Sequence, residues 1–175
     1  PAGTGKTVRV AVFAQGAAAE AAKTEHGIIV QDTAWDGYEE IPSWIMQGYG
    51  TMAMEAGEQL KAQGCERPTH IFVQAGVGSL AGAVVGYFSN LYADNLPTFV
   101  VVEAEAAACL YKGAAAGESG AAPFGALAAM MTMDEYKDLR NDIGLDENSK
   151  VLLFSTEGDT DPDRYKNIVW KGLDK

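Results

Sequence analysis

The chain alternates short β-branched runs with longer segments of helical periodicity, and this alternation limits the folds open to it. The candidate strands are residues 8–14, 28–33, 70–75, 98–103 and 150–155. The candidate helices are residues 16–26, 41–63, 79–92, 121–131 and 134–143. Strands that alternate with helices are typical of parallel sheets, because parallel neighbours need a crossover connection. We therefore predict a three-layer α/β fold, with a mostly parallel, twisted sheet of about five strands and helices on both faces.

Size and charge narrow the class of protein. A chain of 175 residues fits one domain, so we expect a single α/β domain over residues 1–175. The formal net charge of −11 disfavours nucleic acid and anionic membranes as partners, because both require clustered Lys and Arg. No apolar run approaches the roughly 20 residues of a membrane span, and no signal segment is visible. We expect a soluble, cytoplasmic protein that binds a small molecule.

Cys65 and Cys109 should be small, buried or half-buried residues rather than a disulfide.

A glycine-rich turn follows the predicted strand at 70–75. It reads Gln74-Ala75-Gly76-Val77-Gly78-Ser79-Leu80-Ala81-Gly82 and leads directly into a helix. Ligands of open α/β sheets bind at the carboxyl ends of the strands. Glycines let the backbone approach an anion closely, and free N–H groups together with the helix dipole favour a phosphate at this place. The alternative is a tight turn that binds nothing.

Acidic residues accompany the predicted strand at 28–33. Asp32 stands at its end, where a carboxylate can hold a substrate ammonium group or move a proton. Asp36, Glu39 and Glu40 have a simpler explanation, because acids favour the N-terminus of the helix that follows. Asp32 is therefore the functional candidate of this region.

Two hydroxyl residues, Ser155 and Thr156, end the predicted strand at 150–155. Their side chains could meet a heterocyclic ring nitrogen. The acids that follow are explained by a turn and by a helix cap at Asp161, with Pro162 in the first helical position. These acids lack the glutamate that completes a calcium loop, so we predict no metal site.

Two further alternatives are weak. Lys6 and Thr7 would suit a nucleotide-binding P-loop, but a strand follows them where a helix is required. The only histidines, His26 and His70, stand at the end of a predicted helix and the start of a predicted strand. We expect both to be structural rather than zinc ligands or members of a catalytic triad.

Longer blocks of the sequence resemble a known enzyme family. In chain order they are VQDTAWDGYEEIPSWIMQGYGTMAMEA, PTHIFVQAGVGSLAGAVVGYF, ACLYKGAAAG, GESGAAPFGAL and LLFSTEGDTDPDRYKNIVWKG. The blocks resemble diaminopropionate ammonia-lyases, in the family's own order, over most of the chain after Ile28. The resemblance implies the fold of the tryptophan-synthase-β-like group and pyridoxal phosphate as the cofactor. It also implies an amino-acid substrate, 2,3-diaminopropionate, which such enzymes convert to pyruvate and ammonia.

The resemblance also implies roles for particular residues. Those near the cofactor phosphate are Gly76, Val77, Gly78, Ser79 and Gly82. Those near the pyridine nitrogen are Ser155 and Thr156. Asp32 corresponds to a substrate-side carboxylate, and Glu118 lies in the GESG block beside the pocket. We therefore expect Asp32 and Glu118 to be the catalytic candidates.

The chain departs from the family in three places. The family's Schiff-base lysine and a proton-transferring aspartate lie in upstream segments without a counterpart here, and no lysine of this chain stands in a matching context. A long family stretch near Gly117 is missing, and the residues after the opening PAGT diverge. We therefore expect a shortened form of the large domain, natural or engineered, with impaired or absent catalysis. Apolar surface left by the missing part would favour a homo-oligomer. The alternative is a non-catalytic minimal or designed α/β scaffold that retains at most a phosphate-binding loop.

Overall fold

A computed structural model describes residues 28–103 and 118–156 of the chain, without the side chains of residues 118 and 119. Contacts divide the chain into two compact units, Pro1–Gln31 and Asp32–Lys175. The predicted strand at 8–14, the predicted helix at 16–26 and Cys109 lie outside the described residues. All of the described helices and strands belong to the second unit.

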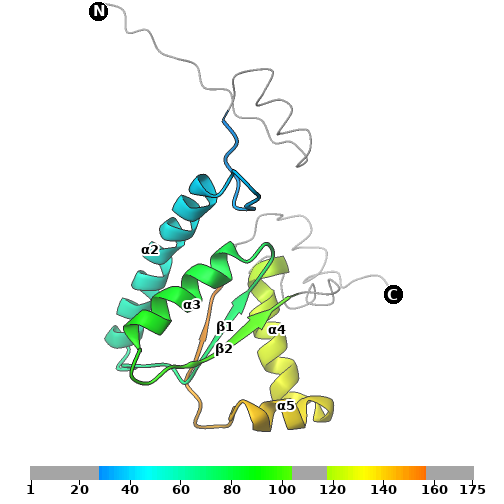
Figure 1. Cartoon of the computed structure of the whole chain (residues 1–175). Helices are drawn as coiled ribbons and strands as arrows, with labels where there is room; N and C mark the ends of the chain where they lie inside the picture. The colour runs from blue at the N-terminus through cyan, green and yellow to red at the C-terminus, as the bar shows by residue number, and fades with distance from the viewer. Residues whose placement is uncertain (1–27, 104–117, 157–175) are drawn as a thin grey trace, which may run out of the picture. The chain divides into compact units, whose positions relative to one another are not determined.

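The described sheet has three parallel strands. They are β1 (His70–Gln74), β2 (Thr98–Val102) and β3 (Val151–Leu153), in the order β2-β1-β3. His70 is in register with Thr98 on one side and with Val151 on the other. All three strands therefore end at the same edge of the sheet, and β1 is central (Figure 1). The predicted parallel α/β fold is confirmed.

Helices connect the strands. They are α2 (Glu40–Ala62), α3 (Ser79–Leu91), α4 (Glu118–Thr132), the 3₁₀ helix η2 (Asp134–Tyr136) and α5 (Lys137–Asp142). Their bounds confirm the predicted helices, except that the segment predicted as one helix at 134–143 is divided into η2 and α5. Gly64, just beyond α2, has a φ of 75°, the left-handed conformation in which helices commonly end. None of the described helices combines the length and apolar character needed to cross a membrane.

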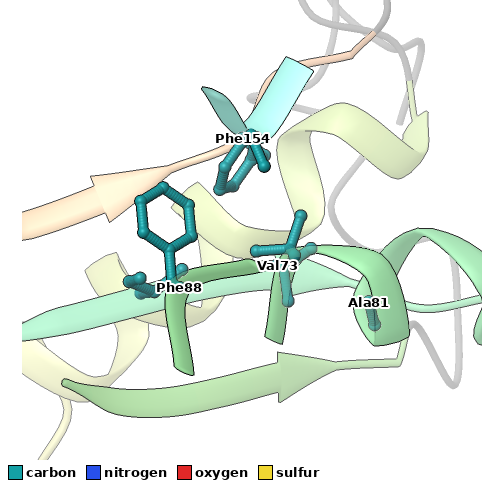
Figure 2. Close-up of a cluster of buried hydrophobic side chains, with 7 residues drawn as sticks. Val73, Ala81, Phe88 and Phe154 are labelled. Carbon is teal, nitrogen blue, oxygen red and sulfur yellow. The ribbon is translucent and has the colours of Figure 1, made fainter. Parts of the chain in front are cut away.

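The core lies between β1 and the helices packed on its two faces. Ile71 and Val73 are fully buried in one cluster with Ala53 of α2, Val84 and Phe88 of α3, and Phe154 (Figure 2). Side chains alternate along a strand, so Phe72, also fully buried, points to the opposite face. Helix α4 contacts both β1 and β2. Burial of each large apolar side chain contributes about 1.5–3 kcal/mol, so both faces of β1 stabilise the fold.

The predicted strand at 28–33 is wrong. No strand is present in residues 28–33, and Ile28 and Val30 are 82% and 72% exposed. An apolar run becomes a strand only when a neighbouring strand pairs with its backbone, and none of the three described strands does so here. The next residues instead form a tight turn, in which Trp35 and Tyr38 exchange backbone hydrogen bonds and stack their rings at 4.1 Å.

Candidate functional site

The glycine turn lies where the sequence predicted it, between the last residue of β1 and the first residue of α3. Gly78 has a φ of 94°, a left-handed conformation that only glycine adopts readily. A Cβ atom built on Gly76 or on Gly78 would meet no atom of the described residues within 4 Å. The described residues therefore leave space beside the backbone of this turn, which a side chain at either glycine would enter.

Backbone N–H groups of the turn are available to a ligand. Those of Val77, Gly78 and Ser79 have no hydrogen-bond acceptor within the part of the chain that the structure describes. Gly78 is the N-cap of α3 and has no side chain with which to cap the helix. The helix dipole adds partial positive charge at the same place. This combination is the usual backbone cradle for a phosphate or another anion.

Ser79 connects the turn to Asp32. Its hydroxyl donates a hydrogen bond of 2.8 Å to the backbone carbonyl of Asp32, and the side chain is 6% exposed. The bond brings two of the predicted site residues together although 47 positions separate them in the sequence. Because it uses the backbone of Asp32, the role of the Asp32 carboxylate stays a prediction.

A polar pair joins the ends of β1 and β3. The Nε2 atom of Gln74 donates a hydrogen bond of 2.8 Å to Oγ1 of Thr156, a predicted site residue. Gln74 is only 6% exposed, and its Oε1 atom has no hydrogen-bond donor in the described part of the chain. An unsatisfied buried polar atom costs about 1–3 kcal/mol, so it is uncommon without a functional reason.

Gln74 is a candidate site residue that was not predicted from the sequence. The available signal was its place as the last residue of an otherwise apolar strand, immediately before the glycine turn. The hydrogen bond that gives it meaning connects residues 82 positions apart, so the sequence does not display it.

The remaining predicted site residues have different surroundings. Val77 is 57% exposed on the turn, and Ser155 is exposed after β3. A Cβ on Gly82 would lie 3.1 Å from Cε of Met46, so this glycine permits close packing of α3 on α2. Glu118 is the first residue of α4, and its side chain is outside the described part.

A groove of about 450 Å³ lies between α2 and the outer edge of β3. Its lining includes Glu55, Gln59 and Gln63 from the helix and residues 151–155 from the strand. None of the residues of the glycine turn lines it. We therefore place the candidate site at the turn, because its backbone donors and Oε1 of Gln74 have no hydrogen-bond partner among the described residues.

The fold and this candidate site define an α/β protein whose glycine turn, at the carboxyl edge of a parallel sheet, has the backbone pattern of an anion cradle. Next to the cradle, the hydroxyl of Thr156 can face a polar ring atom. A phosphorylated heterocycle such as pyridoxal phosphate fits this donor set, because the described residues leave space beside Gly76 and Gly78 and give Oε1 of Gln74 no partner. The described residues therefore suit a phosphorylated aromatic cofactor better than a bare turn.

Comparisons with known proteins give the family. The family model described as "Pyridoxal-phosphate dependent enzyme" matches residues 4–151, and the chain belongs to this family. Diaminopropionate ammonia-lyase of Salmonella typhimurium is 37% identical over 218 residues, which cover 86% of this chain and 54% of that protein. The chain therefore spans about half the length of the curated relatives it matches.

Solved structures agree. A selenomethionine holo structure of diaminopropionate ammonia lyase from Escherichia coli superposes with a TM-score of 0.77 at 32% identity, over 88% of this chain and 54% of that one. The predicted fold and the resemblance to this pyridoxal-phosphate-dependent family are confirmed. The 218-residue alignment is longer than the 175-residue chain, so it includes positions where the relative has residues and this chain has none.

A short stretch resembles a different protein. Large ribosomal subunit protein uL1 of Acinetobacter baylyi is 62% identical over 48 residues, which cover 27% of this chain and 18% of that protein. The match is far shorter than that to the ammonia-lyases and carries no argument about the site.

Proposed function

We propose that this chain retains the cofactor-phosphate cradle of a diaminopropionate ammonia-lyase and binds pyridoxal phosphate there, while it releases little or no ammonia. The observation that carries the proposal is the glycine turn after β1, in which the N–H groups of Val77, Gly78 and Ser79 have no acceptor among the described residues. The family membership supports the choice of cofactor.

The proposed roles follow from position. The N–H groups of the turn hold the phosphate, and the dipole of α3 favours its charge. Thr156 faces the ring nitrogen, with Ser155 beside it. Asp32 and Glu118 act on the substrate side, Asp32 being fixed near the turn through its backbone. When bound, the cofactor supplies an electron sink for reactions at an amino acid's α-carbon.

Weak catalysis is proposed because the chain offers no amine that matches the family's Schiff-base lysine. Among the described lysines, Lys150 directly precedes β3 and so lies at the amino edge of the sheet, opposite the glycine turn. Lys61 is in the last turn of α2, and Lys137 begins α5.

The test is titration of the full chain with pyridoxal phosphate, with inorganic phosphate as competitor. Borohydride reduction and intact-mass analysis then reveal any trapped lysine, and coupled pyruvate detection measures turnover of 2,3-diaminopropionate. We expect pyridoxal phosphate to bind at one saturable site, from which inorganic phosphate displaces it. We expect no single stoichiometric lysine adduct after reduction and little pyruvate from 2,3-diaminopropionate. A stoichiometric adduct with rapid pyruvate release would overturn the proposal of impaired catalysis.

A pair of glycine variants locates the site. Gly76→Ala places a methyl group in the open space of the cradle, whereas Gly86→Ala makes the same change at an exposed position of α3 with nothing within 4 Å. We expect Gly76→Ala to weaken cofactor and phosphate binding by roughly tenfold and Gly86→Ala to leave both unchanged. Absence of saturable binding in the parent chain would favour the alternative, a non-catalytic α/β scaffold.

Self-association is a further part of the proposal. Trp44 of α2 is 56% exposed and Phe124 of α4 is 50% exposed, and aromatic residues of this kind are common in protein interfaces. Light scattering coupled to gel filtration measures the mass directly. A concentration-independent monomer would refute this part alone.

A further inference from the structure

We infer that Gln74 is a positioning residue, which orients the Thr156 hydroxyl so that the hydroxyl donates its hydrogen to the ring nitrogen of a bound ligand. This arrangement favours a ligand whose ring nitrogen is unprotonated. This inference rests on the proposed function, because it concerns the ring of a ligand whose phosphate lies in the glycine turn. Its new element is Gln74, which the resemblance did not include among the site residues.

The direction of the hydrogen bond carries the first step. A threonine hydroxyl has one hydrogen to donate and two lone pairs that accept. Nε2 of Gln74 donates to Oγ1 of Thr156 at 2.8 Å and so occupies one lone pair. The hydroxyl hydrogen stays available, and within the described residues nothing else is bonded to this hydroxyl.

The contrast in burial carries the second step. Thr156 is exposed after β3, where its hydroxyl would otherwise turn freely. Gln74 is 6% exposed and stands at the end of the central strand, paired with Val102 in the neighbouring strand. The fixed amide therefore limits the directions in which the exposed hydroxyl can point, and a ligand does not have to order it on binding.

The orphaned oxygen carries the third step. Oε1 of Gln74 is buried and has no donor among the described residues. Leucine, of similar size, would fill the same position without an unsatisfied atom. The polar side chain at position 74 is therefore explained by its Nε2 atom, which orients the Thr156 hydroxyl beside the glycine turn.

The experiment compares pyridoxal phosphate with its 1-deaza analogue, in which a carbon replaces the ring nitrogen. Both ligands have the same phosphate and aldehyde, so the ratio of their dissociation constants isolates the nitrogen contact. We expect the full chain to bind pyridoxal phosphate roughly tenfold more tightly than the analogue, as one hydrogen bond would give. Thr156→Val should abolish this preference, and Thr156→Ser should keep it.

A double-mutant cycle tests whether Gln74 acts through Thr156. Gln74→Leu should remove most of the preference in the parent chain and have no further effect on it in the Thr156→Val background. In Gln74→Glu the carboxylate accepts the hydrogen of the Thr156 hydroxyl. The hydroxyl then has only lone pairs to offer the ligand, and these can accept a hydrogen bond only from a protonated ring nitrogen. The preference for pyridoxal phosphate should therefore increase as the pH falls, a dependence that loss of packing alone would not produce.

Each outcome decides between the two proposals. If the parent chain binds neither inorganic phosphate nor pyridoxal phosphate, the proposed function fails and this inference fails with it. If phosphate competes but both ring ligands bind equally, or if Gln74→Leu still changes their ratio in Thr156→Val, the proposed function stands and the role of Gln74 is refuted. Should Gln74→Leu not fold, Gln74→Met repeats the measurement, and the Thr156 variants change only an exposed position.

Discussion

The two ends of β1 each carry a polar side chain that is almost fully buried, but the two side chains are bonded differently. At the amino end, His70 is 3% exposed, and its ring nitrogens lie 2.8 Å from Oγ1 of Thr69 and 2.8 Å from the carbonyl of Ile143. At the carboxyl end, Gln74 has one bonded atom and one without a partner among the described residues. A buried polar residue whose bonding atoms are all paired is explained by the fold, whereas a half-paired one beside open space indicates a site.

The backbone shows the same difference. Near the amino end, the N–H groups of Thr69 and His70 both donate to the carbonyl of Lys150, and Thr98 donates to the carbonyl of Thr69. Near the carboxyl end, Ala75 still pairs with Val102, but the turn beyond it has unpaired donors among the described residues. Among the described residues, the amino edge of the sheet is therefore closed by its own hydrogen bonds, whereas the carboxyl edge has backbone donors without acceptors.

The largest effect is expected midway between these ends. Phe72→Ala removes a fully buried ring from the centre of β1 and should lower the free energy of unfolding by about 3–5 kcal/mol. Urea unfolding followed by circular dichroism measures this loss. Phe124→Ala makes the same substitution at a side chain that is 50% exposed, and its effect should be clearly smaller. Equal losses would mean that the face of β1 bearing Phe72 is not a packed core.

The same leucine substitution at each end tests the comparison directly. His70→Leu removes both ring contacts and leaves the carbonyl of Ile143 without its partner, so the free energy of unfolding should fall by about 1–3 kcal/mol. Gln74→Leu removes an atom that was already unsatisfied, and Thr156 can turn to water. Its unfolding free energy should stay within about 1 kcal/mol of the parent value. If Gln74→Leu proved the more destabilising, Gln74 would be a structural residue.

Two substitutions in the glycine turn should affect stability and phosphate binding differently. Gly78→Ala puts a side chain on a residue with a φ of 94° and should lower the free energy of unfolding by about 1 kcal/mol. Gly76 does not have a positive φ, so Gly76→Ala should leave stability within about 0.5 kcal/mol of the parent chain while it weakens phosphate binding. Thermal unfolding with and without phosphate measures both effects. Equal stability of the two variants would contradict the left-handed conformation of Gly78.

The parts that were predictable from sequence depend on local pattern. Periodicity and glycine punctuation located α2, α3 and all three described strands, because an amphipathic helix and a buried strand each leave a regular apolar repeat. His70 is buried, with both ring nitrogens within hydrogen-bond distance of other atoms of the fold, and Cys65 is half-buried, as predicted for its burial. The strand at 28–33 was predicted wrongly because an apolar run does not reveal whether a neighbouring strand exists to pair with it.

The candidate site was predictable only in part, for a related reason. The turn from Gly76 to Ser79 is contiguous, so its glycines could be recognised directly. Gln74 is hydrogen-bonded to Thr156, and the backbone of Asp32 to Ser79, and both contacts form only when the chain folds. A hydrogen bond across the sheet leaves no mark in the order of the residues, and a strand-end glutamine by itself is unremarkable in composition.

The smallest effect is expected at the amino edge, where a carboxylate closes the turn before β3. The hydroxyl of Ser149 and the backbone N–H of Asn148 donate to Oδ1 of Asp146 and hold the pKa of this carboxyl below its ordinary value. A pKa that is lower in the folded state contributes stability above the unfolded pKa, and this contribution is lost as the pH falls through the folded one. The parent chain should therefore lose slightly more stability on acidification than Asp146→Asn, as urea unfolding between neutral and acidic pH would measure. Phosphate binding at neutral pH should be the same in both, because Asp146 lies at the amino edge and the proposed phosphate site lies at the carboxyl edge. A change in binding would show that the two edges are not independent.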